Sequence, residues 1–368
     1  MRFRLALALL LIFAPVTFIR NDATAQQKPA PPALPLTSAW STALDASPSA
    51  WPAGDGKQLF LALQATDQHP AALVAVSLAD GAVRWRRPLD GVRFLAASDD
   101  LVFAAKPDAV VAFAAADGQP AWEVPVDSPP AVAPSTAGGW LVLADEKQVL
   151  AVRAREGTVV WRHPLDSAPV ATPVFAGEGV YLATADSRVL RLAVATGAPV
   201  WQATLAAPAS TLLALDDRVF VGTRGRFFYA LDPRNGHREW RVRIGSDVVG
   251  TPIVDRKLVY FLSLDNLIRG VDRGNGSLHA RQVLTRRALF GPFALGDLLL
   301  VSGMTPTLEA FHAGTLQSAG LYEAGGRELG GVKLAGPIYV VPGKSEEDTL
   351  IVSVTGEGEV LALKKPKK

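Results

Sequence analysis

Residues 179–201, GVYLATADSRVLRLAVATGAPVW, contain one unit of a pattern that recurs along the chain. The unit reads as a strand, a turn, a second strand, a glycine turn and a third strand that carries a tryptophan. Five copies end in a glycine that is followed four residues later by Trp85, Trp122, Trp161, Trp201 or Trp240. Successive tryptophans are 37, 39, 40 and 39 residues apart. A period of about 40 residues, built from short strands and glycine turns, predicts a β-propeller.

The pattern can be followed to both ends of the chain. Its tryptophan position holds Ala280 in the sixth copy and aligns with Gly320 in the seventh. The eighth copy ends near Leu363, before a tryptophan strand begins, whereas Trp40 lies in an extra strand ahead of the first copy. We therefore predict an all-β fold, an eight-bladed β-propeller of four-stranded antiparallel blades, whose ring is closed by an N-terminal strand that completes the last blade. A ring closed in this way leaves no unpaired sheet edge.

The repeated tryptophans and glycines are interpreted as structural positions. A large ring at the same place in each blade is expected to pack against the neighbouring blade and its glycine turn. Stacking on a cofactor or a sugar would require a tryptophan that faces the central channel, and no member of the series stands out in this way. The positions are Trp40, Trp85, Trp122, Trp161, Trp201 and Trp240, with Gly81, Gly118, Gly157, Gly197, Gly236 and Gly276.

The N-terminal segment has the layout of an export signal. Residues 1–25 carry Arg2 and Arg4 near their start, continue with an apolar run and end in Ala-Thr-Ala, which predicts a secretory signal peptide cleaved after Ala25. A retained helix that anchors the protein in the inner membrane is the alternative. Residues 26–37 predict a proline-rich linker, residues 38–363 the propeller and residues 364–368 a basic tail. We expect a periplasmic or secreted protein with no transmembrane domain after signal cleavage.

The composition limits the classes of function. The 368 residues include 37 basic and 35 acidic side chains, and no dense internal basic run points to nucleic acid. The chain has no cysteine, so neither a disulfide nor a lipid-bearing cysteine is available. The five histidines lack the short spacing of a metal site, and the sequence has no phosphate-binding loop or nucleophile elbow. We expect no catalytic residue, no metal and no enzyme activity.

A few polar residues are candidate contacts for a partner. Arg224 and Arg226 lie in the predicted hairpin turn of blade five, where they could bind an acidic surface. Asp247 lies between blades five and six. Arg286 and Arg287 precede blade seven, and the basic tail could contact anionic lipid headgroups. For all of these residues, a solvated surface role is the alternative.

The chain resembles a known repeat family. The Gly-x-x-x-Trp endings and the Thr-Pro openings at residues 172–174 and 251–253 are similar to the PQQ-like (pyrroloquinoline-quinone-like) propeller repeat over roughly residues 38–363. The length, the eight blades and the export signal are most similar to the BamB type of outer-membrane assembly scaffold. The resemblance implies a non-catalytic scaffold that binds protein partners in the cell envelope, and we expect a monomer.

The chain departs from the BamB type in two respects. Proteins of that type carry an N-terminal lipoprotein cysteine, which this chain lacks. They also contact the barrel-forming subunit through acidic residues ahead of a Thr-Pro, and the resemblance carries this role over to Asp247. Val249 stands where a second acidic residue would be expected.

Quinoprotein dehydrogenases share this repeat and supply the alternative function, a small-molecule or quinone-binding propeller. In those enzymes large insertions enclose the cofactor, and the alcohol dehydrogenases add an adjacent cysteine pair and a bound Ca²⁺. This chain has no cysteine and short loops between its repeats. We therefore expect no cofactor, with pyrroloquinoline quinone as the alternative.

Overall fold

The computed structural model describes residues 34–366 except 99, 304–306, 324–337, 344 and 346–347. The chain divides into two units, Met1–Ala30 and Pro31–Lys368. The predicted signal peptide and most of the predicted linker therefore lie outside the described residues. Within the described part, no helix is long and apolar enough to cross a membrane.

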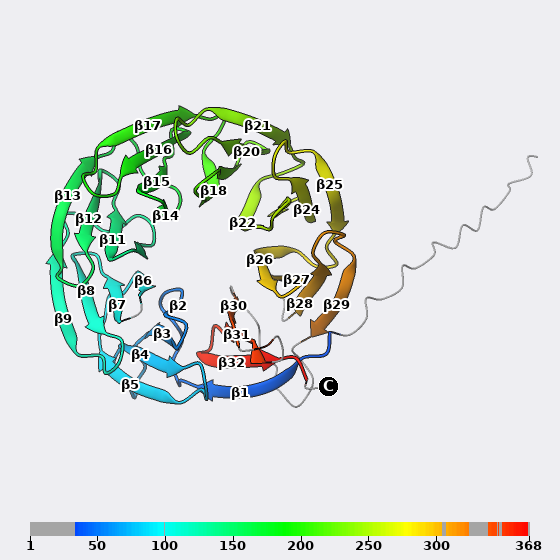
Figure 1. Ribbon diagram of the computed structural model, residues 1–368. Helices are drawn as coiled ribbons and strands as arrows, with labels where there is room; N and C mark the ends of the chain where they lie inside the picture. Colours follow the sequence, from blue (N-terminus) through cyan, green and yellow to red (C-terminus); the bar gives the residue numbers. More distant parts are fainter. Residues whose placement is uncertain are drawn as a thin grey trace, which may run out of the picture. The chain divides into compact units, whose positions relative to one another are not determined.

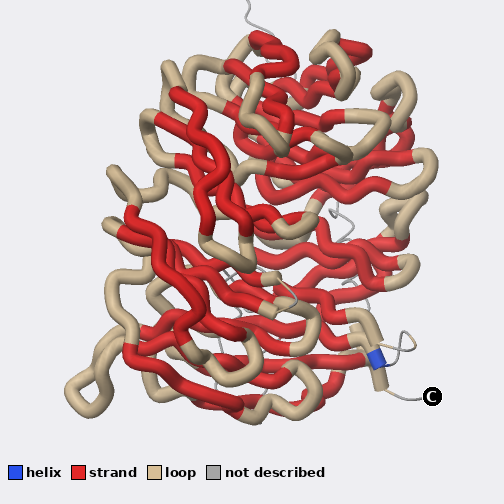
Figure 2. Tube along the Cα trace, turned by 60° about the vertical axis from the view of Figure 1, so that its left-hand side comes forward, coloured by secondary structure: helices blue, strands red, loops and turns tan. Residues whose placement is uncertain are grey.

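The described residues form thirty-two strands in eight four-stranded sheets, which follow one another around a ring (Figure 1). Every strand pairs with its neighbour in antiparallel fashion. This architecture confirms the predicted eight-bladed propeller. Figure 2 shows the strands of the blades with loops at their ends.

Blades one to four each use four consecutive strands, which run in sequence order from the innermost to the outermost. Blade one is β2 (Ala53–Gly54), β3 (Gln58–Leu63), β4 (Ala72–Ser77) and β5 (Val83–Pro88). Blade two is β6 (Phe94–Ala97), β7 (Leu101–Ala105), β8 (Ala109–Ala114) and β9 (Pro120–Pro125). Blade three is β10 (Ser135–Ala137), β11 (Trp140–Ala144), β12 (Gln148–Arg153) and β13 (Thr158–Pro164). Blade four is β14 (Val174–Ala176), β15 (Gly179–Ala183), β16 (Arg188–Ala193) and β17 (Pro199–Thr204).

Blades five to eight repeat this order, except that the last blade takes its outer strand from the N-terminal end. Blade five is β18 (Ala209–Ala214), β19 (Val219–Thr223), β20 (Phe227–Leu231) and β21 (Arg238–Arg243). Blade six is β22 (Val248–Val254), β23 (Leu258–Ser263), β24 (Leu267–Asp272) and β25 (Leu278–Val283). Blade seven is β26 (Ala288–Leu295), β27 (Leu298–Gly303), β28 (Thr307–His312) and β29 (Ser318–Glu323). Blade eight is β30 (Ile338–Val341), β31 (Leu350–Val354), β32 (Glu359–Lys364) and β1 (Thr37–Ala43).

The ring is closed at blade eight, as the sequence predicts. β1 runs antiparallel to β32, with Thr37 opposite Lys364 and Trp40 opposite Ala362. Figure 1 shows the blue β1 beside the red β32. The pairing covers the outer edge of β32, so that blade eight has the same four strands as the others.

Each repeat tryptophan lies on the glycine turn of the next blade. A Cβ atom on Gly197 would come within 2.6 Å of the Trp161 ring, and the backbone of Gly197 has a φ of +70°. Only glycine meets both conditions without strain, because any side chain would collide and would disfavour this φ. The same contact joins Trp40 to Gly81, Trp85 to Gly118, Trp122 to Gly157, Trp201 to Gly236 and Trp240 to Gly276.

Five of these indoles also donate a hydrogen bond to a carbonyl of the next blade. The bonds run from Trp85 to Ala115, Trp122 to Ala154, Trp161 to Val194, Trp201 to Pro233 and Trp240 to Arg273, over distances of 2.7 to 3.1 Å. The indole nitrogen is therefore satisfied where it is buried, which makes a tryptophan suitable for this position.

At the junction between blades six and seven, a small residue stands at the tryptophan position and a larger one at the glycine position. Ala280 takes the tryptophan position, and Leu316 takes the glycine position with a φ of +55°. Leu316 is fully buried in a cluster against which Ala280 packs. The leucine side chain thus fills space that a tryptophan occupies at the other junctions, and the positive φ is retained without a glycine.

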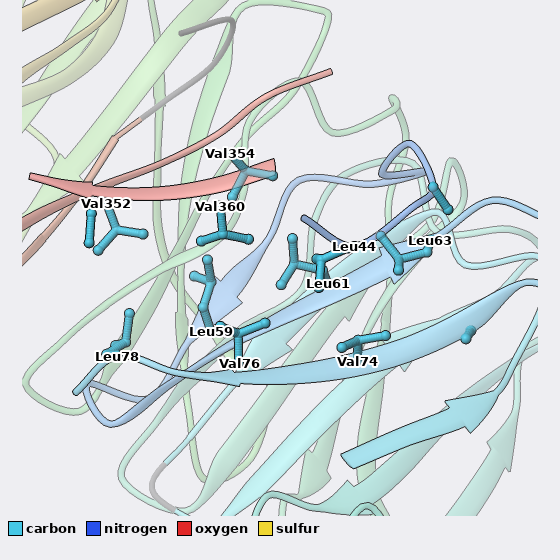
Figure 3. Close-up of a cluster of buried hydrophobic side chains, with 13 residues drawn as sticks. Leu44, Leu59, Leu61, Leu63, Val74, Val76, Leu78, Val352, Val354 and Val360 are labelled. Carbon is cyan, nitrogen blue, oxygen red and sulfur yellow. The ribbon is translucent and has the colours of Figure 1, made fainter. Parts of the chain in front are cut away.

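Hydrophobic clusters lie between neighbouring blades. The cluster between blades eight and one contains Val352 and Val360 from blade eight and Leu59 and Val76 from blade one, all fully buried (Figure 3). Full burial of side chains of this size contributes about 1.5–3 kcal/mol each relative to an exposed position. This packing holds each blade against the next and gives the loops a rigid support.

The antiparallel order of the strands places the loops on two opposite faces. One face, which we call the link face, holds the connections between blades and the turns between the second and third strands of each blade. Its described residues are 44–52, 89–93, 126–134, 165–173, 205–208, 244–247 and 284–287, with the turns 64–71, 106–108, 145–147, 184–187, 224–226, 264–266 and 355–358. The remaining turns, such as 138–139 and 154–157, form the hairpin face.

Candidate functional site

The predicted contact residues Arg224 and Arg226 lie on the link face, in the turn between β19 and β20, and both are exposed. The turn is fastened at its base, where the Thr223 hydroxyl donates to the Phe227 carbonyl at 2.9 Å and accepts the Phe227 N–H at 3.2 Å. The Arg224 N–H donates to the Pro208 carbonyl at 3.0 Å. These bonds fix the backbone and leave both arginine side chains at the surface.

Asp247 lies on the neighbouring link between blades five and six, and it is half-buried. Its carbonyl accepts the N–H of Leu264 at 2.9 Å, which attaches the link to blade six. At the other end of the link, the Ile244 N–H donates to the Arg226 carbonyl at 2.9 Å. The structure thus brings Arg224, Arg226 and Asp247 onto adjacent loops of one face, with both signs of charge present.

Arg286 and Arg287 lie on the next link of the same face. Arg286 forms an ion pair with Glu323 at 3.3 Å, and its N–H donates to the buried Glu309 carboxylate at 2.9 Å. Arg287 is exposed. The first arginine therefore helps to attach the link to blade seven, and the second is available at the surface.

Charge is distributed unevenly around the ring. Residues 209–287, which cover blades five and six and the link that follows, contain 14 basic and 8 acidic side chains. Residues 34–208, which cover the blades before them, contain 12 basic and 17 acidic side chains. The candidate contacts therefore lie in a basic sector of a propeller whose first four blades are acidic.

Sequence reasoning misses an aromatic pair close to the innermost strands of the blades. Trp51 does not belong to the repeat series, and 56% of its surface is exposed. Its ring meets the ring of Phe290 edge to face, with centroids 5.5 Å apart. Phe290 comes from the innermost strand of blade seven and Trp51 shortly precedes that of blade one, with blade eight between them. A pocket of about 390 Å³ beside Trp51 is also lined by Arg93 and Phe94.

The side chains of this pocket do not match a quinone with Ca²⁺. Arg93 supplies one cation, but the described lining residues include no carboxylate or amide side chain of the kind that Ca²⁺ requires. Across the described part of the chain, no three His, Cys, Asp or Glu side chains are grouped so that they could hold a metal ion. The aromatic rings and the single guanidinium fit a small aromatic group that bears a negative charge.

The sequence matches the model of one known protein family. The sequence model of the PQQ-like repeat family described as outer membrane protein assembly factor BamB matches residues 35–137, 71–214 and 195–286, more than half of the chain. None of the curated proteins matches the sequence.

Solved structures share the propeller at low sequence identity. BamB from Moraxella catarrhalis is 15% identical, with a TM-score of 0.68 over 89% of this chain and 97% of that chain. Sqt1 from Saccharomyces cerevisiae is 12% identical, with a TM-score of 0.75 over 91% of this chain and 100% of that chain. The quinohemoprotein alcohol dehydrogenase from Comamonas testosteroni is 11% identical, with a TM-score of 0.70 over 90% of this chain and 77% of that chain. At these identities the structures show a common fold, while the match of the sequence model shows that the chain belongs to the family of the outer membrane protein assembly factor BamB.

Proposed function

We propose that the protein is a non-catalytic scaffold of the cell envelope that binds protein partners during outer-membrane protein assembly. The match to the BamB family over residues 35–286 carries this proposal. The link face supports it, because Arg224, Arg226 and Asp247 present both signs of charge on adjacent loops of a rigid ring. Such an arrangement favours a partner with the complementary pattern and disfavours others.

The proposal includes the location of the protein. Residues 1–25 would direct export, and the mature protein would act as a monomer in the periplasm, with its basic tail as a further contact to the envelope. Mass spectrometry of the protein recovered from the periplasmic fraction tests this part. A mature N-terminus at residue 26 is the expected result, and retention of residues 1–25 in the membrane fraction would contradict it.

Photo-crosslinking in living cells tests the interaction. A crosslinkable residue is introduced in place of Arg224, Arg226 or Asp247, and a matched control replaces the exposed Glu156 on the hairpin face. We expect the three link-face positions to capture the barrel-forming subunit of outer-membrane assembly, and Glu156 not to do so. Equal capture from both faces, or capture of no envelope protein, would contradict the proposal.

The pocket beside Trp51 favours a second candidate function, the binding of a small aromatic anion such as a quinone. The exposed indole, Phe94 and Arg93 supply stacking surface and a cation at one place. Calorimetric titration of the mature protein with pyrroloquinoline quinone, with and without Ca²⁺, tests it. One saturable site that is lost in Trp51→Ala and Arg93→Ala would establish ligand binding and contradict a pure scaffold. Absence of any heat of binding, measured with a folded sample, would eliminate this second function.

A further inference from the structure

The outer strand of blade five presents apolar side chains to one neighbour and arginines to the other. A Cβ atom on Gly276 of blade six would lie 2.6 Å from the Trp240 ring and 3.1 Å from Val242, so these two residues face blade six. Since side chains alternate along a strand, Arg241 and Arg243 face blade four. The Arg241 guanidinium lies 4.8 Å from the centre of the Phe227 ring on that side.

A groove of about 360 Å³ lies between the outer strands of blades four and five. The end of blade four and the link after it contribute residues 202–206, and blade five contributes His237, Arg238 and Arg241. The almost fully buried Tyr229 also lines the groove. Its lining is therefore largely polar and basic and includes the ring of Tyr229.

Arg238 and Arg241 line the groove, Arg243 follows them along β21, and none of the three has an acidic partner among the described residues. All three are exposed. The one acidic residue of the strand, Glu239, pairs with Arg218 at 2.7 Å. The guanidinium groups of these three arginines are therefore available to bind an external anion.

We propose that this groove binds an extended acidic protein segment with carboxylates on alternate residues. Arg241 and Arg243 are two residues apart on a strand, which separates their Cα atoms by about 7 Å. Alternate residues of an extended segment have the same spacing, and a guanidinium can hold a carboxylate through two parallel hydrogen bonds. The ring of Phe227 beneath Arg241 restricts the orientation of that guanidinium.

The groove adjoins the surface used in the proposed function. β21 ends at Arg243, and the next residue, Ile244, is bonded to Arg226 in the turn of the link face. One partner could therefore lie along the groove and reach the loops. The inference rests on the proposed function, because it takes the occupant of the groove to be a protein. It adds that the bound segment is acidic and extended. A recessed groove between two strands favours an extended chain over the flat surface of a membrane.

A labelled peptide of alternating glutamate and serine, titrated with the mature protein and followed by fluorescence anisotropy, tests the inference. We expect saturable binding that weakens with salt, because the contacts are ionic. Charge reversal in R238E/R241E/R243E should weaken binding by about 100-fold, since three ion pairs of about 1 kcal/mol each are lost. The control R86E changes the equivalent exposed position of blade one and should leave binding unchanged.

A second variant distinguishes a loss of binding from a loss of folding. R238K/R241K/R243K keeps the charge but removes the paired hydrogen bonds, so we expect an intermediate loss with an unchanged melting temperature. No saturable binding, or equal loss in R86E and the triple charge reversal, would overturn the inference. Binding of anionic phospholipid vesicles that depends on the three arginines, without binding of the peptide, would overturn it as well.

The two proposals can fail separately. If the peptide does not bind but link-face crosslinks from Asp247 persist, the groove inference fails and the scaffold stands. If the peptide binds through the three arginines but no envelope protein is captured, the groove is a binding site and the proposed role in assembly fails.

Discussion

The outer strands of blades one and five each carry three arginines, and the two sets differ in what they contact. In β5, Arg84 forms an ion pair with Asp80 at 2.8 Å. Arg87 donates to the carbonyls of Asp117 and Gly118 in blade two at 2.9 and 3.1 Å. Two arginines of blade one therefore stabilise the turn of their own blade and the junction with the next.

In β21, Arg241 and Arg243 lie on the opposite side of the strand from the side that Arg87 takes in β5. The position two residues after the tryptophan, which Arg87 holds in blade one, is occupied by Val242 in blade five and faces the next blade in both cases. Arg241 and Arg243 consequently point away from that junction. The comparison shows that the register of an arginine relative to the repeat tryptophan, and not the number of arginines, separates a structural group from one available for binding.

The largest effect is expected when the repeat tryptophan, which both outer strands carry, is removed. Trp85→Ala and Trp240→Ala each delete a ring that packs on a glycine turn and donates a hydrogen bond. We expect each substitution to lower the free energy of unfolding by about 3–5 kcal/mol. Urea denaturation followed by circular dichroism measures the loss. A loss below about 1 kcal/mol at either site would show that the junction is not held by its tryptophan.

A smaller effect is expected at the turn that receives the ring. Gly118 has a φ of +70°, and an added Cβ would lie 2.6 Å from the Trp85 ring, so Gly118→Ala should lower the free energy of unfolding by about 2–4 kcal/mol. Gly138 is the control, since its φ is +55° and no described atom lies within 4 Å of its Cβ position. There the backbone alone opposes alanine, and the loss should be about 1 kcal/mol. Equal losses in the two denaturation curves would mean that the ring contact has no role.

The arginines themselves should separate into two classes. Arg87→Ala removes two hydrogen bonds across the junction and should cost about 1–2 kcal/mol of stability. Arg241→Ala should change stability by less than about 0.5 kcal/mol and instead weaken binding of the acidic peptide. Thermal melting and peptide anisotropy on the same two samples check this. Loss of stability in Arg241→Ala with unchanged peptide binding would reverse the assignment.

The smallest effect concerns pH. In blade five the Arg234 guanidinium and N–H bind the Asp232 carboxylate and lower its pKa to about 2, and in blade one hydrogen bonds from Ser77 and the Ala82 N–H lower the pKa of Asp80. A depressed pKa stabilises the folded state above the unfolded value of about 3.9, and this contribution is lost as pH falls through the folded pKa. We expect a carboxyl signal of Asp232 in NMR spectra to titrate near pH 2. Titration near pH 4 would show that the pair with Arg234 does not persist in solution.

The ring and its closure can be predicted from the sequence, because each repeat places its strands and turns in the same register. The position of Trp40 ahead of the first copy is sufficient to predict the closing strand. The glycine position of blade seven is also predictable by alignment, whereas the exchange of sizes between Ala280 and Leu316 is evident only once the two blades are packed together.

The candidate sites are less accessible to sequence reasoning. The turn with Arg224 and Arg226 can be predicted, but the available arginines of β21 cannot, since they look like ordinary polar positions of an alternating strand. Which of them is free depends on the residues supplied by blades four and six. The contact of Trp51 with Phe290 escapes prediction for a similar reason, because only closure of the ring brings these residues together.

The central claim is that this propeller acts by binding an envelope protein through blade five and the adjoining link face. The most direct measurement is in-cell photo-crosslinking from position 226, compared between the otherwise unchanged protein, the triple reversal R238E/R241E/R243E and the control R86E. The account predicts one crosslinked envelope protein that is lost in the triple reversal and retained in R86E. Absence of any crosslinked envelope protein in all three strains would contradict it.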